Sequence, residues 1–331
     1  FSGVATDISA DGRYVVFASK ATNLYPEDDN GTPDIFIYDT QTKQISDVDL
    51  KPSGLDYLTA RDQPSISGDG KYVAFAAMEH PTINYSIYLW NRDTGLTKRI
   101  SLAELLPGYS RYYANVPQIS DNGKYICYHL NSQIYRYNIE TEETEIASIG
   151  IDGEKGNGNS NDPNISGDGR YIVYASSSTN LVSDDNNGFY DIFVYDAVTK
   201  ENKRVNIGLG GYEAKGTSLY ADISADGSTI TYRSVAHNLV VGDTNEQIDI
   251  FVSGNPSYVQ PEESNIEIIS VSPEGLGGNN NSYYTRSISA DGRYVAFVSN
   301  ATNLTDESTH GGMFIRDREL NKTIQIPGVT N

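Results

Sequence analysis

The chain has 331 residues, and 44 Asp and Glu against 24 Lys and Arg give it a formal net charge of -20. This acidity disfavours binding to nucleic acid or to an anionic membrane surface, because both require clustered basic residues. No segment approaches the ~20 apolar residues of a membrane-spanning helix. The single cysteine, Cys127, excludes an internal disulfide.

A hairpin pattern recurs six times, beginning at Ile8 with ISADGRYVVFAS and again at residues 66, 119, 165, 223 and 288. In each copy Asp-Gly or Asn-Gly separates two short strand candidates, and this dipeptide supplies the positive-φ positions that a tight hairpin needs. The strand after the turn, such as YVVFA, is apolar on both faces. We therefore expect other sheets to cover each sheet on both sides.

A second pattern follows each hairpin, as in DIFIYDTQTKQIS and DIFVYDAVTKENKRVN, and predicts a third strand, a polar turn and a fourth strand. The one helix signal is a capping box formed by Ser101 and Glu104. Six such units predict an all-β fold, a six-bladed β-propeller of four-stranded antiparallel blades. We expect a single propeller over residues 1–331 with contiguous blades at about 1–50, 51–103, 104–149, 150–208, 209–271 and 272–331.

The repeat ISxDGRYVxFxS followed by DIFVYD resembles the TolB-type propeller repeat of bacterial envelope and secreted proteins, and the resemblance covers essentially the whole chain. It implies the six-bladed fold and a secreted, periplasmic or cell-surface location in a bacterium. TolB has an α/β domain before its propeller, which this sequence does not show, so the resemblance does not imply the partner or role of TolB. We expect the chain, which starts without Met, to be a monomer or a module of a larger protein.

Acidic loops between the second and third strands of blades one, four and five share the spacing D-x-N-x-x-x-D. The residues are Asp28, Asn30 and Asp34; Asp185, Asn187 and Asp191; and Asp243, Asn245 and Asp249. Ca²⁺ binds six to eight oxygen atoms from carboxylates, amides, backbone carbonyls and water. The loops therefore predict up to three calcium sites, with a modest dissociation constant of ~10⁻⁴ M.

The alternative interpretation of these loops is that Asp and Asn only form Asx-turns before a strand. It explains less well why the same three residues recur in three blades. Blade six keeps Asp306 and Ser308 but has Gly312 in place of the last Asp, and blades two and three have shorter loops without the motif. Asp39, Asp196 and Asp317 follow the third strand on the opposite face, and we assign them a structural role in turns.

The loops that join the blades are rich in Tyr, Asn and Gly, a mixture favoured in binding surfaces. They are expected on the same face as the acidic loops. Eight tyrosines could line a patch for a protein or glycan ligand or could simply pack between blades: Tyr57, Tyr109, Tyr112, Tyr113, Tyr212, Tyr220, Tyr283 and Tyr284.

Neither a catalytic triad nor a zinc site is indicated, because the four histidines are scattered and no catalytic residue stands out. The sequence favours a calcium-binding recognition module over an enzyme. Two alternatives stay open: a glycoside hydrolase or polysaccharide lyase that uses acids on the central face, and a structural spacer of a large adhesin.

Overall fold

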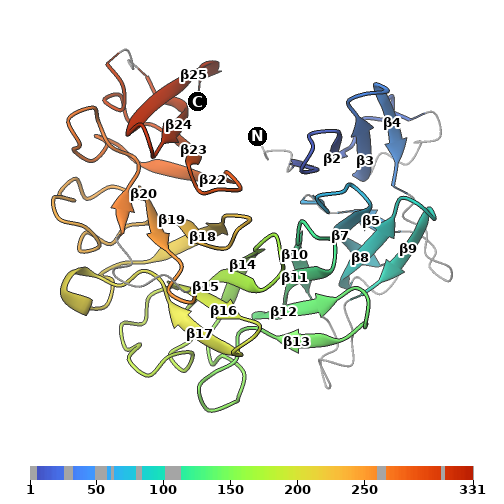
Figure 1. Ribbon diagram of the computed structural model, residues 1–331, viewed down its shortest axis with the longest axis horizontal. Helices are drawn as coiled ribbons and strands as arrows, with labels where there is room; N and C mark the ends of the chain where they lie inside the picture. Colours follow the sequence, from blue (N-terminus) through green and yellow to red (C-terminus); the bar gives the residue numbers. More distant parts are fainter. Residues whose placement is uncertain are drawn as a thin grey trace. The chain divides into compact units, whose positions relative to one another are not determined.

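The protein was analysed as a computed structural model that describes residues 6–25, 33–48, 58–60, 63–79, 84–100, 113–258, 266–306 and 310–330. Six antiparallel sheets of sequence-consecutive strands form the blades of a six-bladed β-propeller, which confirms the predicted fold class (Figure 1). Two compact units, Phe1–Ile146 and Ala147–Asn331, each contain three blades. The helix expected from Ser101 lies outside the described residues.

The first unit contains blades one to three, drawn from blue to green in Figure 1. In blade two, β5 and β6 both pair with β7 and together take the place of one first strand. The strands of the unit are β1 (Thr6–Ile8), β2 (Tyr14–Ser19), β3 (Asp34–Asp39), β4 (Gln44–Asp47), β5 (Leu58–Ala60), β6 (Ser65–Ile66), β7 (Tyr72–Glu79), β8 (Tyr85–Asn91), β9 (Leu96–Arg99), β10 (Ala114–Ile119), β11 (Tyr125–Leu130), β12 (Gln133–Asn138) and β13 (Thr144–Ile146).

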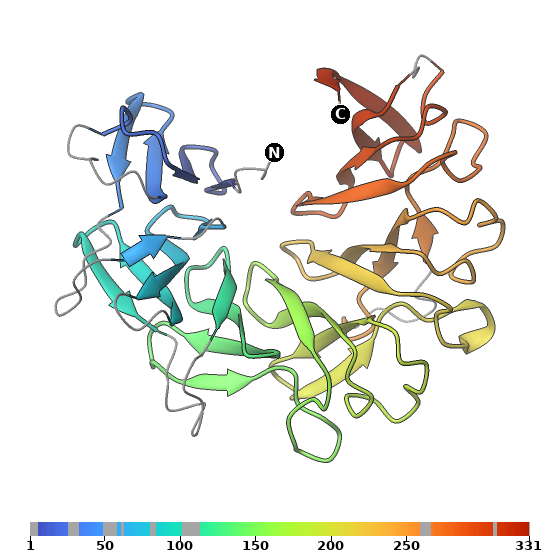
Figure 2. The ribbon, with the colours of Figure 1, turned by 180° about the vertical axis from the view of Figure 1, so that it is seen from behind.

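The second unit contains blades four to six, drawn from green to red and seen from behind in Figure 2. Its one helical segment within the described residues is the short 3-10 helix η2 (Leu209–Gly211). Across the described residues of the whole chain, no helix is long and apolar enough to cross a membrane. The strands of the unit are β14 (Ser160–Ile165), β15 (Tyr171–Ser176), β16 (Asp191–Asp196), β17 (Glu201–Arg204), β18 (Ser218–Ile223), β19 (Thr229–Ser234), β20 (Asp249–Gly254), β21 (Glu267–Ile268), β22 (Ser282–Ile288), β23 (Tyr294–Ser299), β24 (Gly312–Asp317) and β25 (Lys322–Thr330).

The six hairpin repeats adopt the same turn. In blade one the Ser9 hydroxyl donates to Asp11 Oδ1 at 2.7 Å, and the backbone N–H of Arg13 donates to the same oxygen at 2.9 Å. The corresponding Ser–Asp or Ser–Asn bond is present in the other five blades. Only the glycine of each Asp-Gly or Asn-Gly pair has a positive φ, for example 71° at Gly12. The side-chain oxygen therefore closes the turn, while glycine supplies the left-handed residue.

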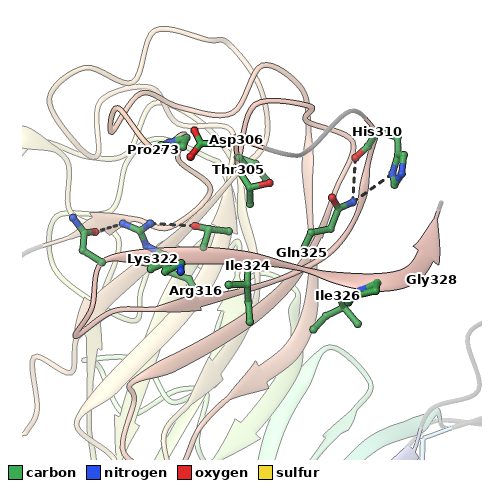
Figure 3. Close-up of a pocket in the computed structure, with 14 residues that line it drawn as sticks. Pro273, Thr305, Asp306, His310, Arg316, Lys322, Ile324, Gln325, Ile326 and Gly328 are labelled. Atoms are coloured by element: carbon green, nitrogen blue, oxygen red, sulfur yellow. Dashed lines mark hydrogen bonds between the residues drawn. The ribbon is translucent and has the colours of Figure 1, made fainter.

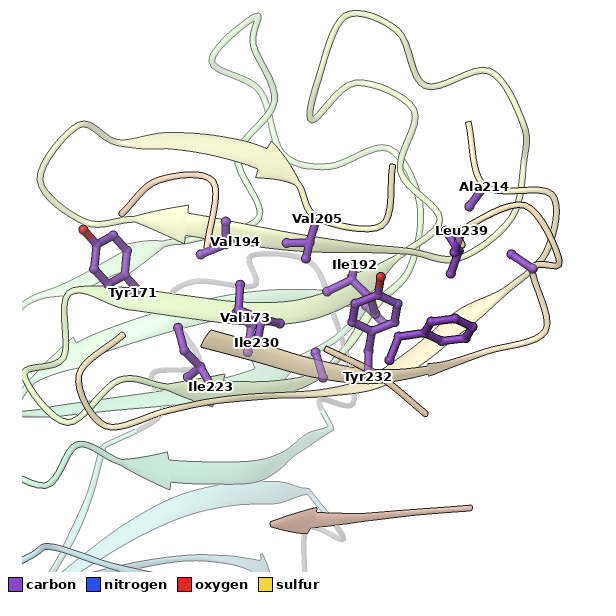
Figure 4. Packing of buried hydrophobic residues seen from close by; sticks show 14 residues of the cluster. Tyr171, Val173, Ile192, Val194, Val205, Ala214, Ile223, Ile230, Tyr232 and Leu239 are labelled. Atoms are coloured by element: carbon purple, nitrogen blue, oxygen red, sulfur yellow. The ribbon is translucent and has the colours of Figure 1, made fainter. Parts of the chain in front are cut away.

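Aromatic residues on the second and third strands form a ring pair at the same position in every blade, with ring centroids 5.7 to 6.1 Å apart. Figure 4 shows how blades four and five pack together: Ile192 and Val194 of β16 belong to one buried cluster with Ile230 and Tyr232 of β19. All six residues of β15 are buried. The sheets thus cover each other on both faces, as the uninterrupted apolar runs predicted.

Candidate cation site in the acidic loops

In blade four, Asp185, Asn187 and Asp191 converge at the start of β16. Asp191 is fully buried, and its two carboxylate oxygens accept hydrogen bonds from Nδ2 of Asn187 at 3.0 Å and Nδ2 of Asn206 at 2.6 Å. Burial raises the pKa of Asp191 to about 6, although the two hydrogen bonds act to lower it. The last Asp of the motif therefore opens the third strand, as predicted, but in a dry environment that disfavours its charge.

A guanidinium group lies beside the acidic loop of blade four. Nη1 of Arg204, at the end of β17, is 3.8 Å from Asp185 Oδ1, 3.8 Å from Asp191 Oδ2 and 3.3 Å from Glu213 Oε1. Asp185 is only 4% exposed, and its Oδ2 has no hydrogen-bond partner among the described residues. Burial raises the pKa of Asp185, and the charge of Arg204 opposes this effect. Blade four thus supplies its own cation to the predicted metal loop.

Blade five has the same carboxylates without this arginine. Asp249 is fully buried and accepts hydrogen bonds from Asn245 Nδ2 at 2.8 Å and from the Ser270 hydroxyl at 2.5 Å. Burial raises its pKa to about 6, and the negative charge of Asp243 adds to the shift. Ile268 of blade five occupies the position that Arg204 occupies in blade four. In its own sheet, each of the two residues pairs with the central aromatic residue of the third strand.

The asparagine of each loop forms an Asx-turn. Oδ1 of Asn187 accepts a hydrogen bond from the backbone N–H of Phe189 at 2.7 Å, and Oδ1 of Asn245 accepts one from Gln247 at 2.8 Å. The amide nitrogen of each side chain donates to the last Asp of its motif. Each amide oxygen keeps a second lone pair that could contact a cation. Asx-turn geometry and metal coordination are therefore compatible at these two residues.

Blades one and six are described only in part. Asp34 opens β3 and is 8% exposed, whereas Asp28 and Asn30 lie outside the described residues. In blade six Asp306 is exposed and Gly312 opens β24, and Ser308 lies outside the described residues. Within the part of the chain that is described, no group of three or more His, Cys, Asp or Glu side chains is placed to hold a metal ion. In blades four and five, the three motif positions supply two carboxylates and one amide.

The aspartates after the third strand form ion pairs with the arginine of the hairpin motif. Arg13 Nη2 lies 2.9 Å from Asp39 Oδ2, and Arg170 and Arg293 make equivalent pairs with Asp196 and Asp317. Hydrogen bonds from Arg13 lower the pKa of Asp39 to about 2. These contacts agree with the structural role inferred from the sequence, although their arginine partners were not anticipated.

Sequence reasoning also missed an asparagine that ties neighbouring loops together in the second unit. Asn238 accepts a hydrogen bond from the backbone N–H of Lys215 at 2.8 Å and donates to the carbonyl of Glu213 at 2.9 Å. Asn180 and Asn303 make related contacts with the loop that precedes their own blade. The recurring Asn-Leu dipeptide could have revealed this clasp. It holds the acidic loops and the blade-joining loops on one face, as expected from the propeller pattern.

The predicted tyrosine patch stays a prediction, and the structure describes the side chains of four of its eight residues. Tyr212 is 72% exposed, while Tyr113 lies against Tyr85 with ring centroids 4.9 Å apart. The guanidinium of Arg233 covers the ring of Tyr220 at 4.2 Å, and the hydroxyl of Tyr283 contacts Asn300 at 3.4 Å. Outside the described residues or side chains lie Tyr57, Tyr109, Tyr112 and Tyr284. Among the described tyrosines, Tyr212 presents the most surface to a ligand.

Two acids on the first strands of their blades form hydrogen bonds to a neighbouring blade. Asp7 Oδ2 accepts from the Ser65 hydroxyl at 3.0 Å and the Ile66 N–H at 2.9 Å. Asp222 accepts from Asn164 and Ile288. These contacts give the two acids a role in joining blades. His129 on β11 is half-buried, and burial lowers its pKa to about 4.

No family model matches the chain, and no curated protein matches it. Solved structures do. A TolB structure from Agrobacterium tumefaciens is 16% identical, with a TM-score of 0.50 over 80% of this chain and 79% of the other. Dipeptidyl peptidase 4 from Porphyromonas gingivalis is 12% identical, with a TM-score of 0.58 over 97% of this chain but 44% of the other. An oligogalacturonate lyase solved with manganese is 9% identical, with a TM-score of 0.56 over 97% and 76%.

These similarities concern the fold, because proteins this distant share propeller architecture while carrying out different functions. They agree with the resemblance seen in the repeat sequence and with the six sheets of the structure. The chain is a six-bladed β-propeller with a TolB-like fold.

Proposed function

We propose that this propeller is a calcium-binding interaction module that works outside the cytoplasm, either secreted, in the periplasm or at the cell surface. The observation that carries the proposal is the contrast between blades four and five. Asp191 faces Arg204, whereas the groups that act on the pKa of Asp249 are Ser270, Asn245 and Asp243, none of which is a cation. A buried carboxylate without a positive partner is costly, so a bound cation would stabilise blade five.

The chemistry of the blade five loop suits Ca²⁺. Asp243 and Asp249 would supply carboxylate oxygens and Asn245 an amide oxygen, and backbone carbonyls and water would complete the shell of six to eight ligands. The acidic loop of blade one shares the same sequence motif, and Asp47 of β4 is the residue aligned with Arg204 there. We place the stronger calcium site in blade five.

The partner surface would be the loop face of the second unit. Apolar side chains are unusually exposed there on loops that the asparagine clasps hold in place, and such patches commonly mark interaction sites. These residues are Ile151, Phe189, Leu209, Tyr212, Val235, Val241 and Leu276. The ligand would be a protein or a glycan. Calcium would then act by keeping the loops of this face in one conformation.

Thermal unfolding with controlled metal content tests the proposal. We expect EDTA to lower the melting temperature and millimolar Ca²⁺ to restore it, since one site at a hundredfold excess over Kd contributes about 2.7 kcal/mol. Mg²⁺ should restore it poorly because it resists irregular oxygen shells. Mn²⁺ is tested as a third ion, because the oligogalacturonate lyase of similar fold was solved with manganese.

The matched variants separate metal binding from general loss of acid. Replacing Asp34, Asp191 and Asp249 together by Ala should abolish the calcium response. Replacing Asp39, Asp196 and Asp317 by Ala removes the same charge from the arginine-paired turns and should leave the response intact. A wild-type melting curve that ignores EDTA and all three ions, together with no heat of binding by calorimetry, would show that the loops are Asx-turns only.

A further inference from the structure

A pocket of about 700 Å³ lies in blade six and is independent of the acidic loops of blades four and five. Part of β25 forms one wall, and Pro273, Thr305 and Asp306 lie on the other side of the pocket (Figure 3). Its volume falls within the range of about 300–1,000 Å³ typical of small-molecule sites. Leu304 and Ile326 contribute apolar surface, and Thr305 and Gln325 contribute hydrogen-bonding groups.

The pocket contains a buried arginine whose hydrogen bonds to Thr323 and Asn321 go to neutral groups. Arg316 on β24 is 6% exposed, and its Nη1 donates to the Thr323 hydroxyl at 3.1 Å while its Nη2 donates to Asn321. Its Nε has no hydrogen-bond partner among the described residues. Figure 3 draws these two bonds beside the start of β25. A buried guanidinium without a carboxylate partner is unfavourable unless something compensates its charge.

The acidic groups near Arg316 compensate its positive charge only in part. Glu267 is the acid that acts on the pKa of Arg316, but its carboxylate is paired with Arg318 at 3.2 Å. Asp306 lines the pocket and is exposed, whereas Lys322 lines it as a second cation. A cationic pocket of this kind stands out in a chain with a net charge of -20.

The fold itself does not require arginine at this position. The residue two places after the central aromatic of the third strand is Tyr38 in blade one, Trp90 in blade two, Tyr137 in blade three and Tyr195 in blade four. In those blades an aromatic side chain occupies this position, and Trp90, Tyr137 and Tyr195 are buried. Blade six has a charged residue there, and it lines the pocket.

We propose that this pocket binds a small, hydroxyl-rich molecule through an oxyanion group, a carboxylate or a phosphate, held by Arg316 and Lys322. A planar guanidinium suits either group, because its N–H donors match pairs of oxygen atoms. Hydroxyl groups of the ligand would bond to side chains such as Thr305 and Gln325. An acidic sugar combines these features in a molecule of suitable size.

Calorimetric titration of the whole chain with three matched sugars tests the proposal. D-glucuronate carries a carboxylate, glucose 6-phosphate carries a phosphate, and D-glucose carries neither. We expect at least one of the two anions to bind and glucose not to bind, and the tighter anion identifies the preferred oxyanion. If neither anion binds more tightly than glucose at tens of millimolar, the proposal is wrong.

Substitutions place the binding in this pocket. Arg316→Met should weaken binding of the anion by about tenfold or more, as expected for loss of a charged hydrogen-bond donor. Because that change is buried and could unfold blade six, the exposed Lys322→Gln is the second variant, and it should also weaken binding. Asp306→Asn should tighten it, because it removes an acid from the lining. Lys215→Gln makes the same charge change on an exposed residue outside the pocket and should leave the affinity for the anion unchanged. If Lys322→Gln and Lys215→Gln have equal effects, the anion does not bind in this pocket.

Discussion

Asp249→Asn probes the electrostatic cost that the proposed calcium site imposes on blade five. In the folded protein, burial raises the pKa of Asp249 from 3.8 to about 6. The folded state therefore binds more protons than the unfolded state between these two values, and its stability falls as the pH rises through them. Above pH 6 the charged, fully buried carboxylate costs up to about 3 kcal/mol when no cation is bound.

The amide variant removes this cost but loses part of the local hydrogen bonding. An amide presents one acceptor oxygen where the carboxylate accepts from both Asn245 and Ser270, and one lost bond costs about 1 kcal/mol. We expect a net gain of about 1–2 kcal/mol at pH 7.5 in EDTA, which corresponds to a melting temperature several degrees above that of the wild type. At pH 4 the gain should disappear, because Asp249 is then protonated in the folded wild type.

Differential scanning fluorimetry of both proteins across this pH range, with EDTA or with millimolar Ca²⁺, measures the effect. Calcium should reverse the order of stability, since only the wild type keeps both carboxylates. Asp196→Asn is the control with the opposite sign: burial raises the pKa of Asp196, but the bonds from Arg170 and Val198 outweigh burial and lower it, so this variant should lose stability at neutral pH. An Asp249→Asn protein that melts below the wild type in EDTA at every pH would refute the reasoning.

Two further predictions concern residues that hold the loop face together. Arg204→Ile gives blade four the residue found at the equivalent position of blade five and leaves Asp185 and Asp191 without their cation. In EDTA the free energy of unfolding, measured by chemical denaturation, should fall by about 3–5 kcal/mol. Millimolar Ca²⁺ should recover part of that loss. A loss that calcium does not reduce would exclude metal binding in this loop. Asn238→Ala removes the hydrogen bonds to Lys215 and Glu213 and should cost about 1–3 kcal/mol without changing the calcium response. An unchanged denaturation midpoint would mean that the clasp contributes nothing to stability.

The architecture could be predicted from the sequence because it depends on local and repeated signals. The Ser and Asp of each hairpin motif are two residues apart, so the turn closes within a few residues, as between Ser9 and Asp11. The alternation of these turns with apolar runs then sets four strands per blade. Six copies of one short pattern make such an inference robust, since chance errors in one copy do not change the repeat.

The acidic loops were only half predictable. Their spacing correctly placed the last Asp at the start of the third strand, at Asp34, Asp191 and Asp249. It did not reveal that Arg204 approaches the carboxylates of blade four while Ile268 takes the same position in blade five. That difference depends on the pairing of the third and fourth strands, which sets the neighbours of each carboxylate.

The number and type of the blades follow from the amino-acid sequence, because turn chemistry and apolar patterning act over a few neighbouring residues. Which charged groups come into contact depends on the tertiary structure. In the sequence Arg316 is an ordinary strand residue. In the structure it is buried, and the turn into β25 places Asn321 and Thr323 beside it. The effect of a charged group on folding stability depends on its three-dimensional surroundings. The same group changes stability little when water surrounds it and lowers stability when it is buried without a partner.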